Sequence, residues 1–268
     1  MKEGYALVSG FARSFISGAP IADATITALE NAQIRLQTDA NGQFGPIEWP
    51  IGEAITLVCE KSGSFWSGYK TTQTPTFIVP PEGINDSNML KNISFQVPSN
   101  MAYRLLSIAM GISEDPECCQ IAATITPPHT TMDNIPQGVE GVTASLSPCV
   151  NSRPYYFSMF PLLHKTNPFI RSLNATSLDG GVAFTNVPPG DYILTAEKNN
   201  IPFSTVHIKA RKGVVINASP PNGPTMLQEP HSKEIEKSPN HHQFFKPLTV
   251  GIAASVCLVG IGLKTYLG

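Results

Sequence analysis

Two stretches of the chain repeat one pattern of polar turn, short apolar run, proline bend and alternating apolar run. They cover residues 38–61 and 176–198. In each stretch a turn glycine lies eight residues before a proline and ten residues before a second glycine; these residues are Gly42, Pro50 and Gly52 in the first copy and Gly180, Pro188 and Gly190 in the second. The repetition indicates two related domains in tandem.

The repeated stretch is typical of antiparallel β-structure. Asn-Gly or Asp-Gly at the turn supplies the positive φ angles that a tight hairpin requires. A short strand follows, with Phe44 or Phe184 on its inner face. The prolines of the bend then break the pairing, because proline has no N–H to donate to a sheet. The alternating runs Ala54–Cys59 and Tyr192–Ala196 bury one face with a period of two.

Further apolar segments around each repeat predict the remaining strands. Proline and glycine turns separate them at regular spacing, which is typical of a β-sandwich. The predicted fold class is therefore all-β, with two sandwiches in tandem. The segments are Ala6–Phe11, Pro20–Leu29, Thr76–Val79 and Ile93–Val97 in the first half, and Gln120–Ile125, Gly138–Leu146, Ser204–Lys209 and Val214–Ile216 in the second.

The second copy carries the motif order Asp179-Gly180, Phe184, Val187-Pro188-Pro189-Gly190 and Tyr192, and the first copy has Trp49-Pro50-Ile51-Gly52 at its bend. This order resembles the carboxypeptidase regulatory-like domain, and the first copy departs further from it. The resemblance implies a transthyretin-like or Ig-like β-sandwich. It also implies a domain that stiffens, spaces or binds rather than one that catalyses a reaction, although a fold alone does not determine an activity.

The segment between the repeats predicts a short helix that joins the sandwiches. Ser99 or Asn100 can cap a helix over residues 101–112, whose apolar residues cover a broad face, and Glu114-Asp115-Pro116 ends it. A strand is the main alternative. The predicted organisation is a first sandwich at 1–98, a helix and linker at 99–117, a second sandwich at 118–219, a polar flexible linker at 220–246 and a hydrophobic helix at 247–267.

The C-terminal segment predicts a membrane anchor. Residues 247–263 carry no charge and would span about 26 Å as a helix, slightly less than a bilayer core. The sequence predicts no signal peptide at the N-terminus, so we expect a tail-anchored protein with its sandwiches in the cytosol. Gly251 and Ser255 form a small-residue pair that would bring two such helices together in a weak homodimer. A terminal helix docked on one sandwich is the alternative.

Aromatic residues in two loops are the candidate partner-binding residues. One set lies in an insertion at Pro148–Leu173, and exposed apolar patches of this kind often mark interaction sites. The alternative is that these side chains cap the open end of the second sandwich. The candidates are Tyr155, Tyr156, Phe157, Phe160 and Leu162 in the insertion, with Trp66 and Tyr69 in the first domain.

Charge and cysteine content restrict the partner classes. The net charge is −2 and only 14% of residues are charged, with no basic patch, so no nucleic-acid partner is expected. The five cysteines form no even-numbered framework, which fits a reducing compartment. Cys118 and Cys119 lack the C-x-x-C spacing of common metal sites.

Catalytic motifs are sparse. The chain has no G-x-S-x-G elbow, no Walker loop and no H-E-x-x-H motif. His231-Ser232-Lys233-Glu234 has the H-x-x-E form of a zinc ligand pair but lies in the polar linker. The second domain is also similar to intradiol dioxygenases, a resemblance that would make Tyr192 and His207 iron ligands, but the second histidine of that family is missing. The expected protein is not an enzyme and needs no cofactor.

Three functions remain open. The first is a membrane-anchored scaffold that presents two sandwiches to a protein partner, as a bacterial effector or accessory protein would. The second is an exported module that binds carbohydrate or another surface outside the cell. The third is a degenerate iron protein built on the second domain.

Overall fold

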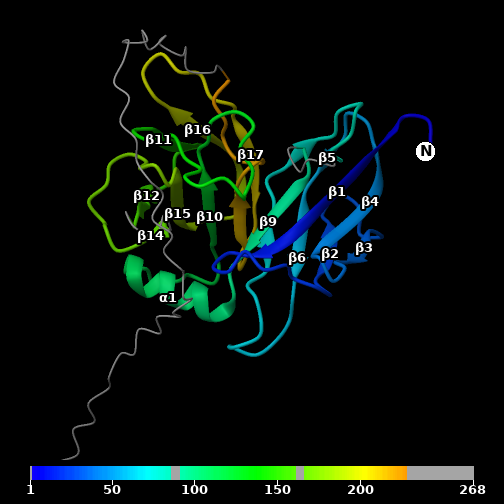
Figure 1. The fold of residues 1–268 in the computed structure, drawn as a ribbon, viewed down its shortest axis with the longest axis horizontal. Helices are drawn as coiled ribbons and strands as arrows, with labels where there is room; N and C mark the ends of the chain where they lie inside the picture. Colours follow the sequence, from blue (N-terminus) through cyan, green and yellow to red (C-terminus); the bar gives the residue numbers. More distant parts are fainter. Residues whose placement is uncertain (1, 86–90, 161–165, 228–268) are drawn as a thin grey trace, which may run out of the picture. The chain divides into compact units, whose positions relative to one another are not determined.

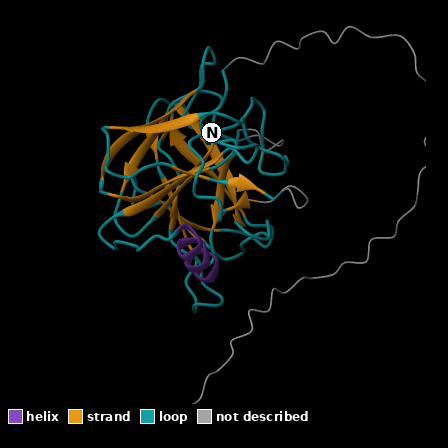
Figure 2. Cartoon of the chain, turned by 90° about the vertical axis from the view of Figure 1, so that its left-hand side faces the viewer, coloured by secondary structure: helices purple, strands orange, loops and turns teal. Residues whose placement is uncertain are grey.

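A computed structural model describes residues 2–85, 91–160 and 166–227. β-Strands and their connecting loops account for nearly all of these residues (Figures 1 and 2). The strands of the first half are β1 (Tyr5–Ser14), β2 (Thr25–Ala28), β3 (Arg35–Gln37), β4 (Gln43–Pro50), β5 (Ala54–Ile55), β6 (Leu57–Glu60), β7 (Thr72–Gln73), β8 (Phe77–Ile78) and β9 (Ile93–Val97).

A helix, α1 (Asn100–Met110), separates this first half from the second. The strands of the second half are β10 (Cys119–Thr124), β11 (Thr143–Ser147), β12 (Tyr155–Tyr156), β13 (Ser158–Met159), β14 (Thr166–Asn167), β15 (Gly181–Val187), β16 (Gly190–Glu197), β17 (Val206–Ala210) and β18 (Val215–Ala218). We call β1–β9 the first module and β10–β18 the second module. The all-β class predicted from the sequence is confirmed.

The two repeated stretches form the same turn. Gly42 and Gly180 have φ angles of 74° and 73°, a region that glycine occupies without strain. The buried hydroxyl of Thr38 donates to the carbonyl of Ile21 at 2.6 Å, and that of Thr176 donates to Val139 at 2.6 Å. These bonds tie each turn to the segment before it.

Each module buries its own hydrophobic core between two layers of strands. In the first module, strands β1, β4 and β9 face β2 and β6, and the rings of Phe44 and Phe95 lie 6.0 Å apart in the core. In the second module, β15, β10 and β18 face β11, β16 and β17 across residues such as Phe184 and Leu194. Apolar burial of this kind is the main favourable term in folding.

The strands of the repeated stretches pair antiparallel with their neighbours, as predicted. The closing strand of each module does not. Strand β9 pairs with β1 in parallel, and β18 pairs with β10 in parallel. In each module the closing strand lies on the far side of the first strand, as the orders β4-β1-β9 and β15-β10-β18 show. A parallel pair needs a crossover connection, and in each module the chain crosses over through strands of the other layer before it reaches this edge.

The two modules share one sheet, which the sequence did not predict. Strand β18 of the second module pairs in parallel with β7 of the first, with Val215 opposite Thr72 and Ile216 opposite Gln73. The resulting eight-stranded order is β12-β15-β10-β18-β7-β6-β2-β3. Each module therefore covers a sheet edge of the other, and the backbone groups of both edges are satisfied.

The shared sheet also changes the burial of β6. The alternating run at Ala54–Cys59 predicted one buried face, but Leu57, Val58 and Cys59 are all buried. Val58 lies opposite Gln73 of β7, whose side-chain amide donates to the carbonyl of Lys209 in β17 at 2.7 Å. The face that would meet solvent in a separate sandwich is therefore turned toward the second module.

A ring of three polar side chains joins β9 to β18 in the interior. The amide oxygen of Asn217 accepts from the backbone N–H of Gln96 at 3.2 Å, and its amide nitrogen donates to the hydroxyl of Ser219 at 2.9 Å. Ser219 in turn donates to the side-chain oxygen of Gln96 at 3.0 Å. Buried polar groups that satisfy each other in this way fix one relative position of the two strands.

Helix α1 is confirmed close to its predicted bounds. The hydroxyl of Ser99 accepts from the backbone N–H of Ala102 at 3.2 Å, which makes Ser99 the N-cap. The helix ends at Met110, before the predicted stop at Glu114-Asp115-Pro116. Gly111 ends it by adopting a left-handed φ of 70°, and its N–H donates to the carbonyl of Ile108.

The structure does not agree with the predicted start of the polar linker at residue 220. Residues 220–226 were expected to be flexible, but Met226 is buried and its N–H donates to the carbonyl of Thr126 at 2.9 Å. No helix of the described residues is long and apolar enough to cross a bilayer. The predicted anchor at 247–267, with Gly251 and Ser255, lies outside the described residues.

We predict that Asn217→Ala lowers the free energy of unfolding by about 1–3 kcal/mol, because it removes the acceptor of the partly buried N–H of Gln96 and the donor to the buried hydroxyl of Ser219. Urea denaturation followed by circular dichroism measures this loss. The exposed Asn199→Ala is the control and should change stability by less than about 0.5 kcal/mol. Equal values for the two variants would show that the polar ring does not hold the modules together.

Candidate functional site

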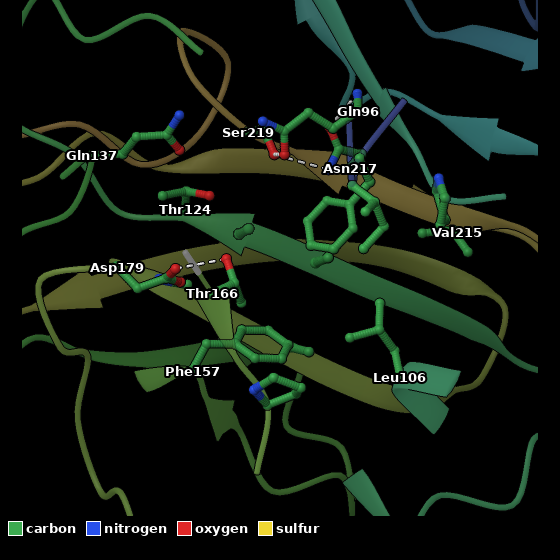
Figure 3. A pocket seen from close by; sticks show the side chains of 18 of the residues that line it. Gln96, Leu106, Thr124, Gln137, Phe157, Thr166, Asp179, Val215, Asn217 and Ser219 are labelled. Atoms are coloured by element: carbon green, nitrogen blue, oxygen red, sulfur yellow. Dashed lines mark hydrogen bonds between the residues drawn. The ribbon is translucent and has the colours of Figure 1, made fainter. Parts of the chain in front are cut away.

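A cleft of about 760 Å³ lies where α1, the shared sheet and both modules meet. Its floor is the outward face of β15, β10 and β18, the face opposite the second core (Figure 3). Ala183, Ala122 and Asn217 lie side by side across these three strands. Small side chains on the floor leave the space above it open.

Apolar side chains from several separate segments form the walls of the cleft. They come from α1, from the insertion, from the loop after β1 and from the loop that precedes β11. The wall residues include Leu106 and Met110; Phe157, Met159 and Phe160; Phe15 and Ile16; and Met132 and Ile135. A largely apolar concavity with a few polar groups is the usual form of a ligand site.

Polar groups lie in two places on this apolar surface. Asp179 and Thr166 lie together on one side, and Asn217 and Ser219 lie on the floor, with Thr124 between the two pairs (Figure 3). The hydroxyl of Thr166 donates to Oδ2 of Asp179 at 2.7 Å, and the N–H of Gly181 donates to Oδ1 at 3.1 Å. Both donors are neutral.

Burial raises the pKa of the Asp179 carboxyl above its ordinary value. The two hydrogen bonds oppose this effect, because they stabilise the charged form. Asp179 has no ion-pair partner among the described residues, whereas Asp133 at the rim pairs with Arg13 at 2.6 Å. Asp179 is therefore a half-buried acid that faces the cleft, and no cation of the described residues lies beside it.

The predicted aromatic residues of the insertion occupy different environments. Phe157 and Phe160 line the cleft. The Tyr155 ring lies 5.5 Å from the Phe157 ring, and its hydroxyl donates to the carbonyl of Pro168. Tyr156 is buried in the second core, where its hydroxyl accepts from the N–H of Ala144 at 2.9 Å, so it cannot contact a partner directly. Leu162 lies outside the described residues.

The two candidate residues of the first module, Trp66 and Tyr69, also lie in different environments. Trp66 is 76% exposed and Phe65 is 48% exposed, and their rings meet edge to face at 5.1 Å. Tyr69 is half-buried and packs against the first core, so its ring is not available as a flat platform. The structure therefore pairs Trp66 with Phe65 rather than with Tyr69.

The two residues considered as iron ligands lie on opposite faces of one sheet. Tyr192 lies opposite Ile208, and both face the core, whereas His207 lies opposite Ile193 on the solvent side. Side chains on opposite faces cannot bind one ion. Within the described ranges, no three His, Cys, Asp or Glu residues gather at one place.

The described cysteines are free thiols in three environments. Cys59 and Cys119 are buried, and burial raises the pKa of each thiol to about 12. Cys118 is partly exposed and Cys149 is exposed. The adjacent Cys118 and Cys119 therefore do not share one environment, and Cys257 lies outside the described residues.

The sequence missed several residues of the cleft. Asp179 appeared only as a hairpin-turn residue, and Leu106 and Met110 appeared only as part of a broad apolar helix face. The sequence does carry one signal for Asp179, because the two repeated turns differ at this position. The residue before the turn glycine is Asp179 in the second copy and Asn41 in the first, and Asn41 is exposed.

Comparison with known proteins identifies no family. No protein-family model and no curated protein matches the chain. Among solved structures, the chain resembles the TIE protein of Bacillus anthracis at 12% identity, covering 80% of this chain and 33% of that chain with a TM-score of 0.26. It therefore spans about a third of that protein.

The shaft pilin SpaA of Lactobacillus rhamnosus GG is a second similar structure. It matches at 8% identity over 83% of this chain and 96% of that chain, with a TM-score of 0.22. These scores are too low to assign a function, which has to be argued from the cleft.

We predict that Asp179→Asn stabilises the protein at about pH 7 but not at about pH 3. A raised folded-state pKa means that the folded state holds the proton more tightly than the unfolded state, so stability falls as pH rises from the unfolded pKa through the folded one. Asparagine removes this penalty and still offers an acceptor to Gly181. The expected gain in Tm at neutral pH is about 2 °C.

Thermal unfolding of both proteins at a series of pH values measures this difference. The exposed Asp191→Asn is the control and should leave the pH profile unchanged. A gain for Asp179→Asn that is the same at every pH would contradict the proposed cause.

Proposed function

We propose that this chain is a non-enzymatic binding protein whose two modules together form a cleft for an apolar segment of a protein partner. The observation that supports this function is the cleft of about 760 Å³ with its small-residue floor and apolar walls. Its volume lies within the range of ligand-binding pockets in proteins. Because its walls come from both modules and α1, the cleft depends on the shared sheet.

The chemistry of the lining supports binding rather than catalysis. The described lining residues include no histidine, cysteine or lysine, the side chains that most often serve as catalytic base or nucleophile. The charged groups are Asp179 and the paired Arg13 and Asp133. The remaining polar groups are hydroxyls and amides, which orient a ligand by hydrogen bonds.

The fold assignment and the membrane anchor belong to the same proposal. The repeated turn, the two cores and the motif order support two transthyretin-like or Ig-like sandwiches of the carboxypeptidase regulatory-like kind, at about 1–98 and 118–219. The charge-free segment at 247–263 supports a single-pass anchor that keeps the modules at a membrane.

We predict that Ala122→Phe reduces peptide binding by at least about tenfold, because the new ring fills the floor of the cleft. Peptides are first selected on the full-length protein from a random display library, and their affinities are then measured by calorimetry. We expect the selected peptides to be predominantly apolar.

The control for this variant is Asp191→Phe, which adds the same ring at an exposed position of β16 outside the cleft. It should change affinity by less than about twofold. Selection of no peptides, or equal binding by Ala122→Phe, would refute the cleft as the partner site.

The exposed pair Phe65 and Trp66 favours a second candidate function, binding to an extracellular surface such as a polysaccharide. Large aromatic side chains seldom stay this exposed without a partner, and flat rings stack well on sugars and interfaces. The pair lies in the loop between β6 and β7 and lines no part of the cleft. The two candidate functions therefore use different residues.

We predict that, if this second function is the correct one, Trp66→Ala lowers retention on insoluble cellulose, chitin or peptidoglycan by about tenfold. Co-sedimentation of the purified full-length chain with each polymer measures retention. Ile78→Ala removes another exposed apolar side chain and is the control. Lack of retention of the unmodified protein on all three polymers would eliminate this candidate.

A further inference from the structure

We propose that Asp179 selects a cationic group, so that the segment received by the cleft carries one lysine or arginine side chain among apolar residues. This inference rests on the proposed function of the cleft and specifies its ligand. It follows from the charges of the lining, from the bonds that Asp179 already makes and from a comparison of the two turns.

The charges of the lining leave one carboxylate for a ligand. Arg13 and Asp133 neutralise each other at 2.6 Å. Within the described part of the chain, Asp179 accepts from neutral donors, the hydroxyl of Thr166 and the N–H of Gly181. The described lining of the cleft therefore has a formal charge of −1, located at Asp179. A cation is the complementary partner for a negative group on an apolar surface.

The described hydrogen bonds of Asp179 do not use all of its acceptor positions. A carboxylate has about four acceptor positions, and the described bonds use one on each oxygen. These two bonds come from β14 and from the start of β15, and they hold the carboxylate from both sides. A ligand N–H can therefore add to the free positions without breaking either bond. Charge-assisted hydrogen bonds of this type are the stronger ones in proteins.

The turn that carries Asp179 places its carboxylate at the cleft. Each repeated turn uses one carboxylate as an acceptor, because Asp39 accepts from the N–H of Gln43 in the first module and Asp179 accepts from the N–H of Gly181 in the second. Asn41 stands where the second turn has Asp179. The carboxylate of the second turn therefore lines the cleft, whereas that of the first turn does not.

Burial of Asp179 makes the selection dependent on pH. The desolvated carboxylate has a raised pKa, and a bound cation would lower that pKa by stabilising the charged form. The cation therefore binds the ionised protein preferentially. Its affinity should rise with pH through the pKa of Asp179 and then become constant, whereas the affinity of a neutral ligand should not change.

The test compares two probes that differ only in their polar end, 4-phenylbutylamine and 4-phenylbutan-1-ol, on the full-length protein. Calorimetry measures both affinities, and the amide signal of Gly181 in nuclear magnetic resonance spectra reports whether the probe lies beside Asp179. We expect the amine to bind about tenfold more tightly than the alcohol near pH 7. Asp179→Asn should remove this preference, and Asp133→Asn, the matched variant at the rim, should retain it.

The outcomes of this test distinguish a failure of the Asp179 assignment from a failure of the proposed function. If amine and alcohol bind in the cleft with equal affinity, or if Asp179→Asn keeps the preference, the assignment of Asp179 is refuted while the cleft remains a binding site. If Asp133→Asn abolishes the preference instead, the cation is recognised at the rim and the assignment is also refuted. If neither probe shifts the Gly181 signal, and peptide selection on the same protein also yields none, the proposed function fails as well.

The source of the cation is tested with the peptides selected on the unmodified protein and on Asp179→Asn. We expect a lysine or arginine between apolar residues in the first set and its loss from the second. Equal frequencies of basic residues in the two sets, with the amine preference intact, would show that the cleft selects small amines rather than peptide side chains.

Discussion

The pairing of β18 with β7 is the interaction on which the rest of the structure depends. Both strands would otherwise be edges with unpaired backbone groups, and β7 is only two residues long. By pairing, they convert two separate layers into one sheet. The polar ring of Gln96, Asn217 and Ser219 then fixes the position of β9 against β18. The cleft forms where this sheet meets α1, so its shape is set by contacts between the modules.

The local features of the fold could be predicted from the sequence because their causes are local. A glycine with positive φ marks each repeated turn, and a serine followed by an apolar helical pattern marks the start of α1. The strands around the repeats follow from alternation and from proline and glycine turns. These signals act within a few residues, and they appear in the structure close to their predicted positions.

The features that position the cleft could not be predicted because they depend on partners far apart in the chain. Alternation at Ala54–Cys59 gives the period of a strand, but the burial of Val58 depends on Gln73 and on β17 of the other module. The environments of the aromatic residues in the insertion could not be predicted for the same reason. Tyr156 and Phe157 are adjacent and similar in sequence, yet one belongs to the core and the other lines the cleft.

The repeat itself helps to separate residues that serve the fold from residues that serve the cleft. Where the copies agree, as at Thr38 and Thr176, the side chain makes the same buried bond in each module and is needed by the turn. Where they differ, as at Asn41 and Asp179, the carboxylate of the turn has a different position. Asp39 accepts from the N–H of Gln43 in the first turn, and Asp179 accepts from the N–H of Gly181 in the second. Only the carboxylate of the second turn lines the cleft, so Asp179 serves the turn and is also placed to contact a ligand.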